Sequence, residues 1–267
     1  MTPQVISQEA VEAQLEERLQ EQLVYRQAFR DLDASNVNSN VIKVPNPADA
    51  MAEPAAVDPT AEYPSTREEY EKISIERQKY GEMIAVPEED VMDNVFDLVA
   101  DHVDLAAREM AEFLDGLAFS ELSANLNAAG PVSDNNNDNL VYDDIQEGVR
   151  VLEENDAMPD IAFFGPKGKA DILKYLADRG TDLGDESVET GQFGAFAGLD
   201  FLFSTTGDLS AHDCILVDSD RYGYEATFTP VETEQKDVFE NDTEKYKVKT
   251  RKGFKAIKSE AAVKVQG

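Results

Sequence analysis

The chain has 267 residues, of which 24 are Lys or Arg and 55 are Asp or Glu, so its formal net charge is −31 at pH 7. This length allows one large domain or two small ones, and a hydrophobic fraction of 42% is typical of a folded chain rather than a disordered one. So acidic a composition argues against binding in nucleic-acid grooves, which requires a basic face.

The acidic residues are spread along the whole chain rather than gathered in one tail. Such a surface is typical of concentrated salt, where a Debye length of about 3 Å screens the repulsion between carboxylates; an acidic protein from an ordinary environment is the alternative. Cys214 is the single cysteine, so no intrachain disulfide forms and we expect a reducing cytoplasm. No signal-like start or membrane-spanning apolar run occurs, so we expect no membrane partner.

The first predicted element in chain order is a helix over residues 7–32. Ser7 suits the N-cap, and Val11, Leu15, Leu19 and Leu23 repeat at helical spacing. This apolar stripe is narrow, so the helix needs a partner surface. A frayed terminal helix is the alternative.

An extended arm is predicted next. Residues 35–65 contain five of the eleven prolines, which exclude a helix or a central strand. Residues 69–86 then return as a strand whose faces are too polar for a buried sheet, because Ile73 and Ile75 share a face with Arg77. A two-stranded ribbon is marginally stable alone, so we expect it to lie on another copy of the chain; a solvent-exposed hairpin is the alternative.

The longest predicted element is an amphipathic helix over residues 88–126. Its roughly 39 residues at 1.5 Å each give a rod of about 55 Å. Acidic residues, Asp115 among them, fill the face opposite the apolar stripe, and Gly130 and Pro131 stop the helix. A helix of an ordinary bundle is the alternative. The stripe comprises Val91, Val95, Val99, Val103, Ala106, Met110, Phe113 and Leu117, flanked by Met92, Phe96, Leu105 and Leu114.

A compact unit of short elements is predicted after the long helix. Its helices span residues 143–155 and 169–178, and they flank a buried strand over residues 160–164. A glycine-punctuated loop then leads into a strand ending at Phe203, and another buried strand covers residues 214–217.

Two loops of this region resemble ligand-binding motifs without matching them. Asp134, Asn136 and Asp138 stand at alternating positions as in a calcium loop. However, Asn139 replaces the turn glycine and Ile145 replaces the bidentate glutamate. The turn over residues 165–168 lacks the spacing of a phosphate loop, and Ala170 follows Lys169 where a hydroxyl residue is required. We therefore expect ordinary loops.

The last fifty residues are predicted to be strands. One strand, residues 222–229, precedes a polar loop near residues 234–243; a lysine-rich strand follows, which Gly253 bends or bulges, and a final strand carries Val263. Residues 245–267 contain eight basic residues and one acidic residue. This stretch either lines nucleic acid or pairs with acids of a neighbour or of strand 222–229; cross-strand charge pairing favours the second interpretation.

Catalytic motifs are not found in the sequence. It contains no serine–histidine–acid set, cysteine–histidine pair or Rossmann glycine fingerprint. His212 and Cys214 have no further His or Cys nearby to complete a metal site, and His102 is the only other histidine. We therefore expect no enzyme, no catalytic or metal-binding residue and no cofactor, with structural cations left unassigned.

The order of these parts resembles the major capsid proteins of tailed viruses with the HK97 fold. The resemblance covers nearly the whole chain, from an N-terminal arm through a proline-rich loop and a long helix to a compact domain and a closing hairpin. It is carried by residues 82–87, 161–166, 173–176, 198–204, 251–256 and 262–265.

The resemblance implies an α+β, HK97-like capsid fold. Its parts would be an N-terminal arm (1–40), an extended β-hairpin loop (41–87), a peripheral domain with the spine helix (88–135), an axial domain (136–217) and peripheral-domain strands (218–267). It also implies a major capsid protein that assembles as pentamers and hexamers into an icosahedral shell around viral double-stranded DNA. The chain would be made in the host cytoplasm and located in the virion; the charge points to a halophilic archaeal host.

The partners implied are other copies of the chain, portal, scaffolding and decoration proteins, and packaged DNA bound non-specifically. No long cleavable segment precedes the arm, so the scaffolding protein would be separate. A covalent crosslink between subunits would join a lysine to an asparagine. Lys43, Lys72 or Lys79 with Asn241 are the candidates, and nothing in the sequence favours such a link. Two alternatives stay open: an encapsulin-like compartment shell and a halophilic enzyme of unrelated α+β fold. The expected subunit-interface residues are Tyr63, Tyr70, Arg77, Lys79, Lys245, Lys247, Lys249 and Arg251.

Overall fold

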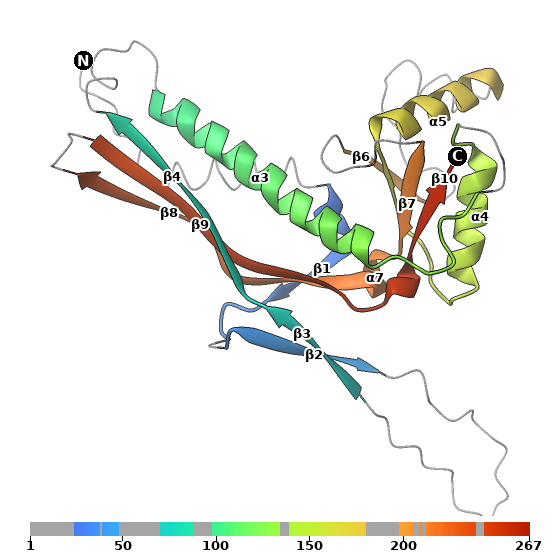
Figure 1. Ribbon diagram of the computed structural model, residues 1–267, viewed down its shortest axis with the longest axis horizontal. Coiled ribbons are helices and arrows are strands. Elements are labelled where there is room, and N and C mark those ends of the chain that lie inside the picture. Colours follow the sequence, from blue (N-terminus) through green and yellow to red (C-terminus); the bar gives the residue numbers. More distant parts are fainter. Residues whose placement is uncertain are drawn as a thin grey trace, which may run out of the picture.

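The computed structural model describes residues 24–37, 39–47, 70–87, 98–133, 139–179, 198–204, 209, 212–238 and 243–267. These residues form three sheets with helices packed on two of them (Figure 1). The elements are η1 (Tyr25–Ala28), β1 (Phe29–Asp33), β2 (Val41–Pro47), β3 (Tyr70–Glu76), β4 (Gln78–Pro87), α3 (Leu98–Ala124), α4 (Tyr142–Glu153), β5 (Ile161–Phe164), α5 (Pro166–Arg179), β6 (Asp200–Phe203), β7 (Asp213–Val217), α7 (Ser219–Tyr222), β8 (Gly223–Val238), β9 (Thr243–Ala256), η2 (Ser259–Ala261) and β10 (Ala262–Gln266).

The first sheet has the strand order β1-β8-β9-β4, and the long helix α3 lies along one face of it (Figure 1). β8, β9 and β4 pair antiparallel, whereas β1 pairs parallel with β8. Alternation along β9 buries Tyr246, Val248 and Thr250, so one face of this strand belongs to the core.

The second sheet has the order β10-β7-β5-β6 and lies beside α4 and α5 at the other end of the molecule (Figure 1). All five residues of β7 and all four of β5 are buried, and the apolar runs over residues 161–164 and 214–217 account for most of this burial. A single hydrophobic cluster contains Phe163 of this sheet together with Leu122 of α3 and Tyr222 beside the first sheet. The two sheets therefore share one core.

The third sheet is the ribbon of β2 and β3, which extends away from the body (Figure 1). The predicted arm is therefore present, but it ends earlier than residue 86. β3 and β4 form two consecutive strands, and only β3 pairs with β2; β4 instead pairs with β9 along its whole length. The sequence missed this pairing because the partner strand lies about 165 residues further along the chain.

The buried face of α3 differs from the predicted stripe. Phe113 and Leu105 are 49% and 53% exposed, whereas Asp115, predicted on the polar face, is 1% exposed. The helix packs against β4 and β9 on one side and against η1 on another, so its buried face is rotated toward η1. Residues 88–97 of the predicted helix lie outside the described residues.

The helix predicted over residues 7–32 is wrong in its last part. The structure has a single 3-10 turn, η1, followed by the strand β1. Phe29 makes edge contacts with the rings of Tyr222 and Phe254, at centroid distances of 5.3 and 5.5 Å, and β1 pairs with β8. These tertiary contacts override the local helical pattern.

The remaining short elements agree well with the sequence. α4, β5, β6, β7 and β10 are confirmed within a few residues, and α5 begins three residues early because Pro166 suits a first helical turn. The polar loop predicted from residue 234 is wrong, since β8 continues to Val238. β10 joins the second sheet rather than the first, and β1 joins the first sheet, so the expected domain ranges do not coincide with the sheets.

Candidate assembly surface

The arm crosses β9 at Gly253. A Cβ atom at this position would lie closer than 3.0 Å to the carbonyl oxygen of Glu76 and 2.9 Å from Cγ2 of Ile75. Gly253 therefore permits a close approach of two backbones rather than the bend predicted from the sequence, and the register shifts of this strand pair lie elsewhere, near Thr229. Ile75 is buried in a small cluster with Ala226 and Phe228, which attaches the arm to the first sheet.

Arg77 lies at the junction of β3 and β4 and fixes the direction of the arm. Its Nη2 donates to Oδ1 of Asn40 at 2.6 Å, and its backbone N–H donates to the Asn40 carbonyl at 2.8 Å. Its guanidinium also lies 5.8 Å from the ring centroid of Phe228. Arg77, predicted at a subunit interface, thus already binds within its own chain.

The cations of β9 lie on one face of the first sheet. Lys245, Lys247, Lys249 and Arg251 alternate with the buried residues of the strand, and Gly253, two residues further on, contacts the arm. The cations and the arm are therefore on the same face.

Acidic residues of β8 neutralise part of this row. Lys247 pairs with Glu234 at 3.1 Å, and Lys249 pairs with Glu232 at 3.2 Å and with Glu234. The hydrogen bonds from Lys249 and Lys247 lower the pKa of Glu234 to about 2. Pairing of this stretch with β8 is thus confirmed, both here and between Lys252 and the buried Glu225.

Three cations of this face have no acidic partner among the described residues: Lys79, Lys245 and Arg251. Lys79 and Arg251 are direct cross-strand neighbours on β4 and β9. Like charges in directly opposite positions destabilise a sheet, so this pair favours an acidic group from outside the described part of the chain.

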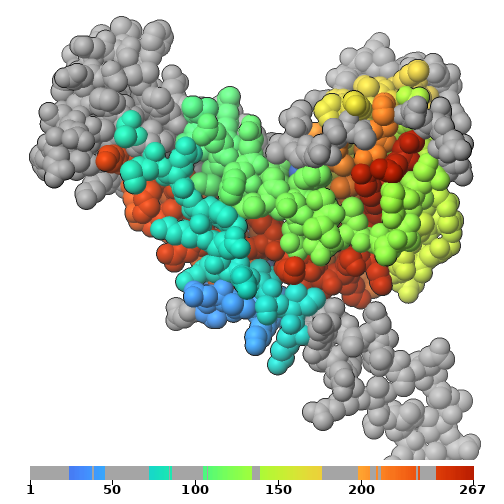
Figure 2. Space-filling model, in the orientation of Figure 1, coloured from blue at the N-terminus to red at the C-terminus, as the bar shows by residue number. Residues whose placement is uncertain are grey.

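A groove of about 470 Å³ runs between α3 and β4, which lie side by side in Figure 2 (green and teal). Its walls include Tyr80 and Phe113, whose ring centroids are 5.2 Å apart, and Met110. Met83 on β4 is 60% exposed nearby along the strand. β4 is also an edge strand, whose outer side has no partner strand within the described residues. Exposed apolar side chains beside an open edge are typical of an interface.

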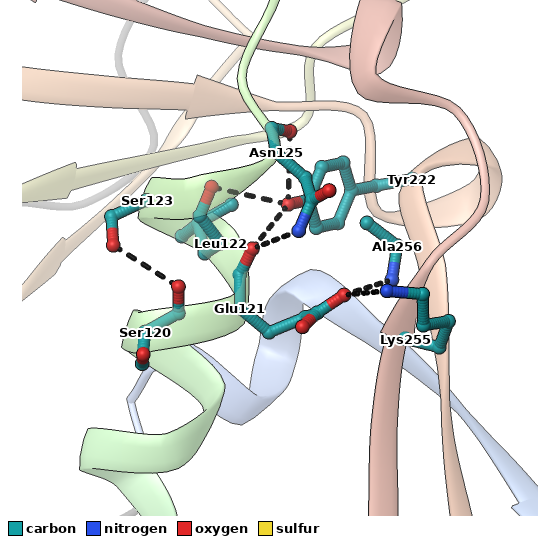
Figure 3. Close-up of polar contacts among 8 residues, drawn as sticks. All are labelled: Ser120, Glu121, Leu122, Ser123, Asn125, Tyr222, Lys255 and Ala256. Carbon is teal, nitrogen blue, oxygen red and sulfur yellow. Dashed lines mark hydrogen bonds and ion pairs between the residues drawn. The ribbon is translucent and has the colours of Figure 1, made fainter. Parts of the chain in front are cut away.

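The C-terminal end of α3 is clamped to the closing strands (Figure 3). The Tyr222 hydroxyl lies 3.2 Å from the carbonyl oxygens of both Leu122 and Asn125, at the end of the helix where carbonyl groups lack i+4 donors. Glu121 accepts from Lys255 Nζ at 2.9 Å and from the Ala256 N–H at 3.2 Å. Burial and the nearby Glu121 charge raise the pKa of Tyr222, so its hydroxyl stays protonated and can donate.

The other residues considered from the sequence do not form a ligand site in the described part of the chain. No group of three or more potential metal ligands occurs among the described residues. His212 pairs with Asp171, and burial raises the pKa of Cys214, so this thiol is inert. Tyr63 and the calcium-like stretch at residues 134–138 lie outside the described residues, and for Tyr70 only its place in β3 is described. No described helix is long and apolar enough to cross a membrane.

Comparison with known proteins agrees with this architecture. A family model described as phage capsid protein matches residues 69–265. No curated protein sequence matches. Among solved structures, the capsid of a native GTA particle aligns with a TM-score of 0.72 and 14% identity, over 91% of this chain and 89% of that chain. A structure from Microbacterium phage Oxtober96 aligns with a TM-score of 0.68 and 14% identity, over 91% of this chain and 90% of that chain. The capsid of cyanophage P-SCSP1u aligns with a TM-score of 0.68 and 9% identity, over 91% of this chain and 88% of that chain.

Proposed function

Because the chain belongs to the phage capsid protein family, we propose that its copies assemble as pentamers and hexamers into an icosahedral shell around double-stranded DNA. The protein is a structural major capsid protein of the virion. It is a structural protein rather than an enzyme and needs no cofactor, although cations can screen its carboxylates. The family favours neither an encapsulin-like compartment nor an enzyme of unrelated fold. Portal, scaffolding and decoration proteins are its further partners, and it meets packaged DNA through counterions.

The observation that carries this proposal is the cation row on the arm side of the first sheet. Residues 48–69, which join β2 to β3, contain six acidic residues and one basic residue. The cations Lys79, Lys245 and Arg251 lack acidic partners in the described part of their own chain. We infer that the acidic tip of one copy's arm lies on the basic face of a neighbouring copy, as charge complementarity favours.

Arg251→Glu is expected to reduce the yield of assembled shells at least tenfold, because it places a carboxylate opposite the acidic arm of the neighbour. The stability of the isolated chain should change little, since Arg251 has no ion-pair partner within the described residues. Gradient sedimentation and thermal unfolding measure the two effects. Arg251→Lys, which keeps the charge, should assemble normally. Normal shells from Arg251→Glu would refute this contact.

The net charge of −31 supports a tailed virus of a halophilic archaeal host. We expect the shells to dissociate when monovalent salt is lowered from about 2 M to about 0.02 M, because the Debye length then grows from below about 3 Å to about 20 Å and neighbouring carboxylates repel one another. Light scattering without divalent ions measures this. Shells that stay intact in the dilute buffer would contradict the halophilic assignment and leave the capsid function in place.

A further inference from the structure

Asp115 is a buried carboxylate at the contact between α3 and η1. Its side chain is 1% exposed. Oδ1 accepts the backbone N–H groups of Val24 at 3.0 Å and Tyr25 at 2.7 Å, which begin the first turn of η1. Oδ2 is buried and has no hydrogen-bond partner among the described residues. Residues 1–23 precede this turn, so Asp115 holds the point where the N-terminal segment joins the body.

The two oxygens of Asp115 favour opposite protonation states. The backbone donors on Oδ1 stabilise the carboxylate, whereas the burial of Oδ2 without a donor makes the charged form costly and favours the neutral one. Burial is the larger effect and raises the pKa of Asp115 to about 6, against the lowering by the N–H groups of Tyr25, Val24 and Arg26.

Charged groups near Asp115 are already engaged with other partners. η1 contributes Tyr25 and Arg26, and the Arg26 guanidinium binds Glu225 of β8. The other titratable groups along α3 also have partners. Glu82 of β4 lies beside Glu109, and the Tyr222 hydroxyl of α7 donates to the Leu122 carbonyl. Two lysines of β9 form ion pairs, Lys255 with Glu121 and Lys252 with Glu225. Among the described residues no cation pairs with the Asp115 carboxylate.

We propose that Asp115 is a proton-dependent latch on the root of the N-terminal segment: the protonated carboxyl holds η1 on α3 more tightly than the carboxylate does. The sign follows from linkage. Asp115 binds a proton more strongly when η1 is docked on α3 than when the contact is open and the carboxyl is solvated. The docking of η1 is therefore strongest at low pH and weakens as the pH rises through about 6. At neutral pH the contact between η1 and α3 therefore opens more readily. This inference concerns the single chain and does not depend on the proposed shell.

Hydrogen–deuterium exchange of the full chain at pH 5.0 and 7.5, corrected for intrinsic exchange chemistry, tests the latch. The protection of amides in η1 (Tyr25–Ala28), relative to those of β7 (Asp213–Val217), should be about tenfold greater at pH 5.0 than at pH 7.5. Asp115→Asn should remove this pH dependence. The matched control is Glu112→Gln, which changes the same charge on an exposed side chain of the same helix and should keep the tenfold effect.

Two results would overturn the latch. One is a wild-type protection ratio that does not change with pH. The other is a pH dependence that persists in Asp115→Asn. The shape of the wild-type profile is a second measure that does not rely on the variant: protection that falls between about pH 4 and about pH 6 and levels off above that supports the latch, and protection that is already constant from about pH 4 upward contradicts it.

Discussion

Replacing Gly253 by valine is expected to detach the β2–β3 arm from the first sheet and abolish shell assembly. The added Cβ would lie closer than 3.0 Å to the Glu76 carbonyl oxygen, which is backbone and cannot turn away. β3 would have to move, and Ile75 would leave its cluster with Ala226 and Phe228. We expect a loss of about 1–3 kcal/mol in the free energy of unfolding and no particles in electron micrographs, because an arm aimed in a different direction cannot reach its neighbour.

Gly116→Ala is the matched control for this change. The position of a Cβ at Gly116 has nothing within 4 Å, and the residue lies inside α3. Alanine should therefore stabilise the helix by about 0.5–1 kcal/mol and leave assembly unchanged. Particles of normal size and yield from Gly253→Val would show that the crossing of β3 over β9 does not set the arm's direction.

Tyr222→Ala is expected to lower the free energy of unfolding by about 3–5 kcal/mol. The side chain is fully buried, contacts the ring of Phe29, and donates to the carbonyl groups that end α3. Its loss leaves a cavity and removes the hydroxyl donor from the carbonyl groups at the end of the helix, so the clamp between α3 and the closing strands should open. Urea unfolding followed by circular dichroism measures the change.

Tyr222→Phe separates the two contributions, since it removes only the hydroxyl. We expect a loss of about 1–2 kcal/mol, the usual effect of leaving a buried acceptor unpaired. A phenylalanine variant as stable as the wild type would mean that water replaces the hydroxyl at Leu122 and Asn125. Equal losses for both substitutions would instead place the whole effect on the hydrogen bonds and none on the packing.

Local patterns predicted the elements whose environment is set by near neighbours. The continuous apolar runs at residues 161–164 and 214–217 appear in the buried strands β5 and β7, and α4 begins within one residue of its predicted start. The order of these parts was enough for the resemblance to phage capsid proteins, which the family match confirms. The excess of basic residues over 245–267 likewise predicted pairing with acids of strand 222–229, which the ion pair of Lys252 with Glu225 confirms.

Contacts between distant segments could not be read from local patterns. Asp115 looked like a surface residue because its partners, Val24 and Tyr25, lie about 90 residues earlier in the chain. Gly253 signalled an irregularity in a strand, but nothing local shows that β3 crosses there. A glycine inside a charged strand is a signal in the sequence that could have prompted a search for such a partner.

The most direct test of the central claim is the size of the purified protein in about 2 M salt, measured by light scattering and electron microscopy. We expect closed shells, or free pentamers and hexamers that close when a scaffolding protein is added. A chain that stays a monomer or dimer in this salt, with scaffolding protein present, would contradict the proposal that this protein builds a capsid by self-assembly.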